Sequence, residues 1–308
     1  MRYPVFSGYF ADPFVWLAGS TYYAVGTGPV EDGSNLFPLL TSPDLSHWRP
    51  AGGALQHPGP ELGSDFWAPE VAFAEGRYWM YYSAGWADRG HHLRVASSDV
   101  PDGPYVDTGV ALTDPFVCPF AIDASPFQDD DGSWYLFYAR DFLDSTDGDC
   151  RAGTGIVVQP MASMTELSGE AATVIRARYD WQRFLNNRLM YGRRFDWHTV
   201  EGPCVRKRLG RYWCLFSTGR WENETYGMDW AVSDSVTGPW TFDGDASGAR
   251  LLRTVPGELI GPGHNSVITG PDSETDFLVY HAWDAAMTAR RMYMEPMVWT
   301  NRGPRLRQ

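Results

Sequence analysis

A short aromatic segment that follows a turn recurs five times along this chain of 308 residues. Segments of this kind, rich in Tyr, Trp and Phe and bounded by turn residues, are typical of β-strands. The five copies begin 56, 56, 78 and 65 residues apart and are Tyr22–Tyr23, Tyr78–Tyr82, Trp134–Tyr138, Tyr212–Phe216 and Phe277–Tyr280. An imperfect repeat of this size indicates small sheets that cannot bury both faces alone and therefore stack on one another.

A second shared segment lies 10 to 13 residues before each aromatic strand. The five copies are Asp12-Pro13-Phe14, Ala68-Pro69-Glu70, Asp123-Ala124-Ser125, Glu201-Gly202-Pro203 and His264-Asn265-Ser266. If their first residues occupy one structural position in five radially arranged sheets, they converge on a common axis. We therefore expect three carboxylates and one imidazole to share a pocket: Asp12, Asp123, Glu201 and His264.

In four of the five units, turn residues closed by an apolar or aromatic side chain follow the aromatic strand, as expected between outer strands of a blade. The pattern predicts an all-β fold, a five-bladed β-propeller with about four strands a blade, as one domain over residues 1–308. A β-helix or a two-sheet sandwich would show shorter and more regular spacing. Residues 176–200 lengthen the third interval, and we expect an inserted loop, part of it helical, near the mouth of the pocket.

Composition narrows the class of partner. Aromatic residues make up 15% of the chain, and 32 Gly and 22 Pro supply many turns, which fits an all-β protein. The net charge of -13 argues against nucleic acid as a partner. No apolar run approaches the roughly 20 residues that cross a bilayer, so no membrane association is expected. Because the chain opens Met1-Arg2-Tyr3-Pro4 without a signal peptide, we expect a cytoplasmic protein, or a secreted one if a leader has been removed.

Two residues of the second unit leave alternatives open. Trp67 offers a flat face that could stack on a sugar ring, or it could belong to the core between blades. Glu70 is an acid by residue type, but it lies two residues beyond the position that faces the axis. We therefore expect Glu70 to have a structural role or to support the site from behind.

Five motifs, taken in order, resemble glycoside hydrolase family 43 over nearly the whole chain. They are Asp12-Pro13, Phe66-Trp67-Ala68-Pro69-Glu70-Val71, Ile122-Asp123, Val200-Glu201-Gly202-Pro203 and Gly261-Pro262-Gly263-His264-Asn265-Ser266. The resemblance implies a five-bladed propeller that hydrolyses α-L-arabinofuranosides or β-D-xylosides with inversion. The expected partner is then an oligosaccharide derived from hemicellulose or pectin.

The resemblance also implies a role for each matching residue. Asp12 is the general base, Glu201 the general acid, and Asp123 the residue that tunes the acid and orients the substrate. Trp67, His264 and Arg290 are expected to bind substrate; Arg291 is an alternative to Arg290, because Ala289 stands where the family usually has glycine. No cofactor is required, and a structural calcium ion near His264 is the one metal site that the resemblance leaves open.

The chemistry of the bare residues agrees with this role. Inverting hydrolysis needs one carboxylic acid and one carboxylate about 6.5 to 9.5 Å apart, and a third carboxylate nearby favours the protonated form of its neighbour. We expect an exo-acting α-L-arabinofuranosidase. The alternatives are a β-D-xylosidase, a galactofuranosidase, an endo-arabinanase, or a non-catalytic carbohydrate-binding propeller. A related fructoside hydrolase would start Asn-Asp-Pro-Asn, whereas this chain has Ala11-Asp12-Pro13-Phe14.

Overall fold

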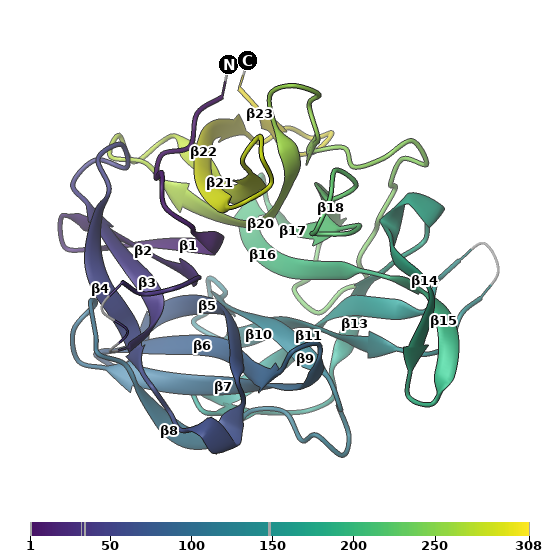
Figure 1. The fold of residues 1–308 in the computed structure, drawn as a ribbon, viewed down its shortest axis with the longest axis horizontal. Helices are drawn as coiled ribbons and strands as arrows, with labels where there is room; N and C mark the ends of the chain where they lie inside the picture. The colour runs from purple at the N-terminus through teal and green to yellow at the C-terminus, as the bar shows by residue number, and fades with distance from the viewer. Residues whose placement is uncertain (1, 32, 34, 147–148, 308) are drawn as a thin grey trace.

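The computed structural model describes residues 2–31, 33, 35–146 and 149–307, which fold almost entirely into β-strands (Figure 1). Two single-turn 3-10 helices, η1 (Pro60–Leu62) and η2 (Asp180–Gln182), complete the regular structure of these residues. Among the described residues, no helix has the length and apolar character needed to cross a bilayer.

Four sheets have four antiparallel strands each, and the chain visits the strands of each sheet in order. The first sheet holds β1 (Ala11–Ala18), β2 (Thr21–Thr27), β3 (Asn35–Ser42) and β4 (Arg49–Gln56). The second holds β5 (Asp65–Ala74), β6 (Arg77–Trp86), β7 (Arg89–Ser98) and β8 (Val106–Ala111). The fourth holds β16 (Val200–Arg208), β17 (Arg211–Thr218), β18 (Gly227–Ser233) and β19 (Leu252–Arg253). The fifth holds β20 (Ile260–Thr269), β21 (Asp276–Trp283), β22 (Arg290–Val298) and β23 (Arg305–Leu306).

The third sheet, in the middle of the chain, has seven strands. Its inner strands are β9 (Ala121–Gln128), β10 (Trp134–Phe142) and β11 (Gly153–Ser163), to which β12 (Glu166–Leu167) and β13 (Ala172–Arg176) pair. A hairpin of β14 (Arg183–Met190) and β15 (Arg193–His198) joins β11 through a single parallel bridge. The insertion expected at residues 176–200 is thus mainly this hairpin, and its helical part is limited to η2, because its residues pair across a tight turn at Tyr191-Gly192.

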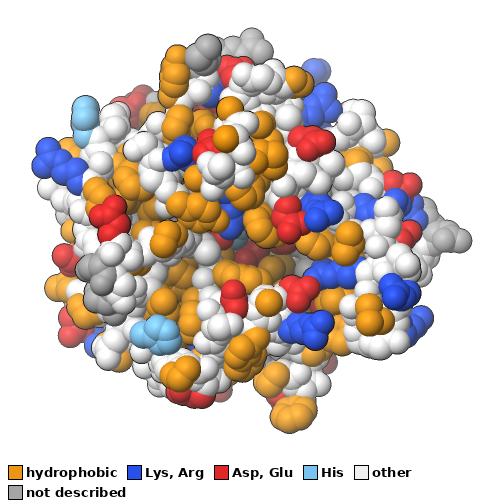
Figure 2. Space-filling view, in the orientation of Figure 1, with side chains coloured by type: hydrophobic (Ala, Val, Ile, Leu, Met, Phe, Trp, Pro, Cys, Tyr) orange, Lys and Arg blue, Asp and Glu red, His pale blue; other side chains and the backbone are white. Residues whose placement is uncertain are grey.

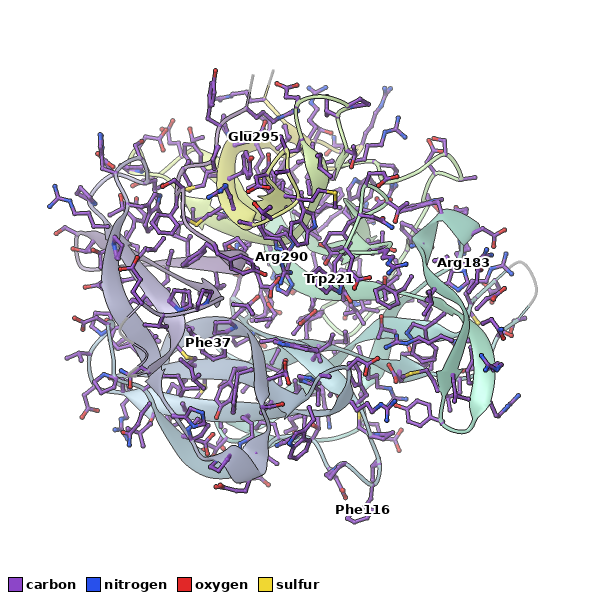
Figure 3. All side chains as sticks on the ribbon, viewed as in Figure 1. Phe37, Phe116, Arg183, Trp221, Arg290 and Glu295 are labelled. Atoms are coloured by element: carbon purple, nitrogen blue, oxygen red, sulfur yellow. The ribbon has the colours of Figure 1, made fainter. Side chains whose placement is uncertain are left out.

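Five apolar clusters hold the sheets together, and each fills the space between two neighbouring sheets. The fifth cluster joins the last sheet to the first, so the sheets close a ring. Phe37 illustrates the packing, because it meets Tyr82 of the second sheet edge-on at 5.8 Å (Figure 3). Burying an aromatic side chain of this kind contributes about 1.5–3 kcal/mol, which explains why the aromatic strands recur once a sheet.

The N-terminal segment also closes the ring. Val5 and Phe10 donate backbone hydrogen bonds to Met292 and Arg290 of β22, so the start of the chain runs along the last sheet. The predicted all-β propeller arrangement is therefore confirmed. We predicted five blades of about four strands each. Four sheets have four strands, whereas the third sheet differs from the prediction because it has seven.

A β-bulge interrupts the innermost strand of each sheet between its second and fifth residue. The first bulged residue has a positive φ in every case: Asp12 (50°), Ala68 (47°), Asp123 (60°), Gly202 (59°) and His264 (47°). A bulge bends the strand and re-aims the side chains beside it, and a positive φ in a residue other than glycine marks local strain. The five bulges therefore place the five shared segments at one level around the axis.

One prediction about this level was wrong. Glu201 does not occupy the position of Asp12, Asp123 and His264, because Gly202 is the bulged residue of β16. Glu201 precedes the bulge and corresponds in register to Trp67 of β5. The comparison of the five repeats was therefore displaced by one residue in this unit. The position of a bulge within a strand cannot be recognised from the residue types alone.

Candidate active site

A cavity of about 310 Å³ opens where the innermost strands begin. Figure 2 shows the corresponding recess near the centre of the face, with acidic and basic side chains around it. Six predicted site residues line the cavity: Asp12, Trp67, Asp123, Glu201, His264 and Arg290. The structure thus brings together residues that lie as far as 278 positions apart in the chain.

A set of hydrogen bonds between sheets fixes the bulges around this cavity. In four sheets, the N–H of the first bulged residue donates to a side chain at the end of the second strand of the preceding sheet. The pairs are Ala68 to Thr27 Oγ1 (2.8 Å), Asp123 to Ser83 Oγ (3.0 Å), His264 to Ser217 Oγ (2.6 Å) and Asp12 to His281 Nδ1 (3.0 Å). These bonds satisfy buried donors that the bulges remove from the strand ladder.

The fifth bulge finds a different acceptor. Ala139 stands at the strand position that holds Thr27, Ser83, Ser217 and His281 in the other sheets, and it has no acceptor to offer. The Gly202 N–H instead donates to Oδ2 of Asp123 at 2.8 Å. The carboxylate of Asp123 is therefore held by the strand that carries Glu201.

Asp12 is buried among basic groups. Its Oδ1 lies 3.4 Å from Arg290 Nη1 and 3.4 Å from His264 Nδ1. Burial by itself raises the pKa of Asp12, but the charges of His264 and Arg290 outweigh it and hold the pKa well below its usual range. Because burial lowers the pKa of His264, the Arg290 guanidinium is the neighbouring cation that remains at neutral pH. Asp12 is therefore ionised over the whole working range.

His281 supports Asp12 as a neutral ring. Its Nδ1 accepts the backbone N–H of Asp12, so this nitrogen carries no proton and the nearby Asp12 Oδ1, at 3.3 Å, receives no hydrogen bond from it. Burial lowers the pKa of His281 to about 4, in agreement with a neutral ring. His281 thus orients the backbone of Asp12 without neutralising its carboxylate.

Glu201 has the opposite character. Burial raises the pKa of Glu201 to about 7, and the negative charge of Asp12 adds to this effect. The Tyr226 hydroxyl donates a 2.8 Å hydrogen bond to Oε1 of Glu201, which lowers the pKa in part. Glu201 can therefore keep a proton close to neutral pH.

Asp123 lies close enough to Glu201 for the two charges to affect each other. Burial raises the pKa of Asp123 well above its usual value, and the charge of Glu201 raises it further, while the Gly202 N–H opposes both. We expected Asp123 to keep Glu201 protonated, but the pKa of Glu201 is raised by its own burial and then by the negative charge of Asp12, against the hydrogen bond from Tyr226. The Gly202 N–H fixes the position of the Asp123 carboxylate, so Asp123 contributes to the geometry of the site.

The predicted binding residues surround these carboxylates. Arg290 donates to the Tyr9 hydroxyl at 2.9 and 3.0 Å, and its guanidinium lies 4.5 Å from the ring centre of Trp221 (Figure 3). Arg291 instead pairs with Asp284 at 3.0 Å, so the choice between the two arginines falls on Arg290.

Trp67 lies between the cavity and the packing behind it, and its contact with a sugar stays a prediction. It lines the cavity, yet one face of its indole stacks on His91 at 3.7 Å, and it packs against a small cluster containing Ile122 and Phe120. A sugar ring can therefore meet Trp67 only on the surface that His91 leaves uncovered.

Sequence reasoning missed five residues of the cavity wall: Thr27, Asp65, Ile122, Trp221 and Tyr226. Trp221 and Tyr226 lie in the loop between β17 and β18, which brings them over the axis; no repeat pattern marks this loop. Tyr226 packs directly against Gly263, where an added Cβ would lie 1.9 Å from the tyrosine ring. The Gly-rich approach to His264 was a signal that something packs closely there.

The donor set around His264 gives little support for a calcium site. In the described part of the chain, no three His, Cys, Asp or Glu side chains are grouped so that they could hold a metal ion. The carboxylate next to His264 is Asp12, which Arg290 already engages. Calcium prefers six to eight oxygen ligands, and this surrounding of imidazole and guanidinium groups does not resemble such a shell.

Taken together, the cavity presents one carboxylate that stays ionised and one carboxyl group that keeps a proton near neutral pH. Two carboxyl groups whose environments push their pKa values apart form an acid and base pair. Such a pair can protonate a leaving group while it activates water.

Comparison with known proteins agrees with this chemistry. A family model described as glycosyl hydrolases family 43 matches residues 1–304. A β-D-galactofuranosidase of Aspergillus niger is 30% identical over 303 residues, which cover 93% of this chain and 78% of that protein. An extracellular exo-α-(1→5)-L-arabinofuranosidase of Streptomyces avermitilis is 24% identical, and the match covers 88% of this chain and 54% of that protein.

The fold points to the same group of proteins. The crystal structure of a thermostable family-43 glycoside hydrolase superposes with a TM-score of 0.82 at 29% identity, over 97% of this chain and 93% of that one. With the family model spanning nearly every residue and the acid and base pair at the axis of the ring, the chain belongs to glycoside hydrolase family 43.

Proposed function

We propose that this glycoside hydrolase removes terminal α-L-arabinofuranosyl units from oligosaccharides by a single displacement that inverts the anomeric centre. The observation that carries the proposal is the pairing of an ionised Asp12 with a proton-bearing Glu201 in one small cavity. At about 310 Å³ the cavity lies at the lower end of the range for ligand pockets. This size suits one terminal sugar and therefore exo action.

In this proposal Asp12 takes a proton from the attacking water, and Glu201 gives its proton to the leaving oxygen. Asp123, held by Gly202, orients the sugar between them. Arg290 keeps Asp12 ionised, Arg290 and His264 contact the sugar hydroxyls, and Trp67 supports the ring. After the reaction Asp12 holds a proton and Glu201 is ionised, and exchange with solvent restores both.

A β-D-galactofuranosidase is the second candidate, because the Aspergillus niger relative carries that name. The two sugars have the same ring configuration, and galactofuranose bears one additional exocyclic CHOH group. Both sugars can therefore present the same ring hydroxyls to the cavity. β-D-Xylosides, internal arabinan bonds, and binding without catalysis remain the further alternatives.

We also propose that the seven-stranded sheet is the fifth blade of a single propeller domain. Its inner strands β9, β10 and β11 occupy the third position of the ring, between the clusters that join it to the second and fourth sheets. The hairpin of β14 and β15 is then an insertion on this blade.

A panel of aryl glycosides tests the assignment. Para-nitrophenyl α-L-arabinofuranoside should be the preferred substrate, β-D-galactofuranoside the second, and proton NMR should show the inverted anomer first. A clear preference for a hexopyranoside, or a product that retains its configuration, would contradict the proposal. Retention on arabinan resin without hydrolysis of any glycoside would favour the non-catalytic alternative.

The roles of the two carboxyl groups are separated by the leaving group. Glu201→Gln should reduce kcat/KM by about 10² to 10⁴ for an oligosaccharide and much less for a dinitrophenyl glycoside, which needs no protonation. Asp12→Ala should reduce both by similar, large factors. Rescue of Asp12→Ala by the better leaving group would show that the two roles are reversed.

A further inference from the structure

A second cavity, of about 340 Å³, lies beside the first on the same end of the propeller. It is formed where the turn between β6 and β7 faces the inserted hairpin of β14 and β15. The turn contributes Asp88 and Arg89, the hairpin contributes Leu189 and Tyr191, and Phe120 also lines the cavity. Nothing in the catalytic arrangement uses this space.

The wall between the two cavities is one layer of side chains thick. Trp67 and Ile122 line the catalytic cavity and pack in one cluster with Phe120, which lines the second cavity. His91 fills the same layer, because its ring stacks on Trp67 at 3.7 Å and meets Phe120 edge-on at 5.7 Å. The second cavity is therefore within reach of a sugar chain that extends beyond the catalytic cavity across this layer.

The second cavity lies on the side where the leaving group must be. The basic groups around Asp12, namely Arg290, His264 and His281, all belong to the last sheet. In the proposed exo action the catalytic cavity takes the terminal sugar, so the rest of the substrate extends beyond that cavity, and the second cavity is the neighbouring space across the layer of Trp67 and His91. The hairpin and its cavity are therefore placed to receive the part of the substrate that leaves.

The hairpin is held in place at two points. Arg188 Nη2 donates to Asp88 Oδ2 of the second sheet at 2.6 Å, and the Tyr191 hydroxyl donates to Asp141 Oδ2 of β10 at 2.6 Å. Anchoring of this kind fixes a loop before it binds a ligand, which reduces the ordering cost of binding. The cavity is thus preformed rather than assembled from a free loop.

Its surface suits a carbohydrate. Leu189 is 61% exposed and Tyr191 is 43% exposed, although large apolar side chains on an anchored hairpin would be expected to pack inward. An exposed aromatic ring with an apolar neighbour can stack on the C–H face of a sugar, and Asp88 and Arg89 offer hydrogen-bonding groups at the opposite edge. This combination of one aromatic face and a few polar groups is the ordinary composition of a sugar subsite.

We propose that this second cavity is a subsite for the neutral oligosaccharide that leaves, so that the β14–β15 hairpin selects substrates by their leaving group. The proposal rests on the proposed glycosidase function and adds the substrate class: a terminal sugar carried by an oligosaccharide rather than by a small alcohol.

The experiment compares two substrates that share the terminal sugar and differ in the leaving group. Leu189→Ser and the double variant Leu189→Ser/Tyr191→Ala should lower kcat/KM for arabinotriose at least tenfold, and leave kcat/KM for para-nitrophenyl α-L-arabinofuranoside within twofold. Val100→Ser is the matched control, because Val100 is 48% exposed in the turn after β7 and lines neither cavity. Equal losses on both substrates, or no loss on arabinotriose, would overturn the proposal.

A binding measurement keeps this result separate from the proposed function. In a Glu201→Gln background, titration calorimetry with arabinotriose and xylotriose should give at least tenfold weaker binding after Leu189→Ser/Tyr191→Ala. If the protein hydrolyses no glycoside, the proposed function fails, but weaker binding in this test still supports the subsite. Unchanged affinity, or no binding before the substitution, would overturn it.

Discussion

The hydroxyl of Tyr226 should set the pH at which activity is lost on the alkaline side. Tyr226→Phe removes the 2.8 Å hydrogen bond to Glu201 and keeps the ring that packs against Gly263. The fold should therefore be unaffected, because an aromatic ring of the same size still fills the space. Only the charge balance at Glu201 changes.

The sign and size of the effect follow from the contact. The hydroxyl stabilises the ionised form of Glu201, so its loss raises the pKa of Glu201 above about 7. A hydrogen bond to a charged group is worth about 1.5–3 kcal/mol, and one pKa unit corresponds to about 1.36 kcal/mol. The pKa should rise by about one to two units. Since the acid must be protonated to act, the alkaline limb should move to higher pH by the same amount.

The assay is the pH dependence of kcat/KM with an arabino-oligosaccharide, whose poor leaving group requires the proton. Tyr212→Phe is the control, because the Tyr212 hydroxyl donates a similar 2.6 Å bond to Asp129 Oδ2, and Tyr212 lies at the opposite end of the β16–β17 pair from Glu201. It should leave the limb in place. An alkaline limb that stays fixed in Tyr226→Phe, or moves to lower pH, would refute the assignment of Glu201 as the titrating acid.

Three further outcomes follow from the charges and contacts of the site. Ala139→Ser gives the seven-stranded sheet the hydroxyl acceptor that it lacks. The new hydroxyl should compete with Asp123 for the Gly202 N–H and reduce kcat by about tenfold; an unchanged kcat would contradict the idea that this bond positions Asp123. Arg290→Gln removes the cation that stays charged beside Asp12 at neutral pH. The pKa of Asp12 should then rise by at least one unit, and an acidic limb should appear in the pH profile of kcat/KM. Burial raises the pKa of Glu70 to about 8, so folding keeps it protonated, and stability should fall as pH rises from about 4.5 to 8, by up to about 1.36 kcal/mol a unit. In Glu70→Gln this fall should be absent, as thermal unfolding at pH 5 and pH 8 would show, and an equal difference in Tm from wild type at both pH values would contradict the burial effect.

The sequence by itself determined the strands, the ring and most of the site. The aromatic strands could be found because each sheet must bury one against its neighbour, and a repeated physical demand leaves a repeated pattern. Asp12 and Asp123 could be found because they occupy the same position in their repeats, where a carboxylate within an apolar strand has no structural reason. The sequence left open which of the two arginines of the last motif faces the cavity, and in the structure Arg290 lines the cavity while Arg291 pairs with Asp284.

Only the tertiary structure decided what depends on contacts between distant segments. In β16 the bulge begins at Gly202, one residue after Glu201. Residue types do not reveal this position, because a bulge is a property of the pairing between two strands. Tyr226 reaches Glu201 from a loop outside the repeat, and the proton affinity of Glu201 depends on this contact, on burial and on Asp12. The sequence therefore determined which residues can carry out the chemistry, while the tertiary structure decided their charges, since a pKa depends on the neighbours that folding brings near and the water that it excludes.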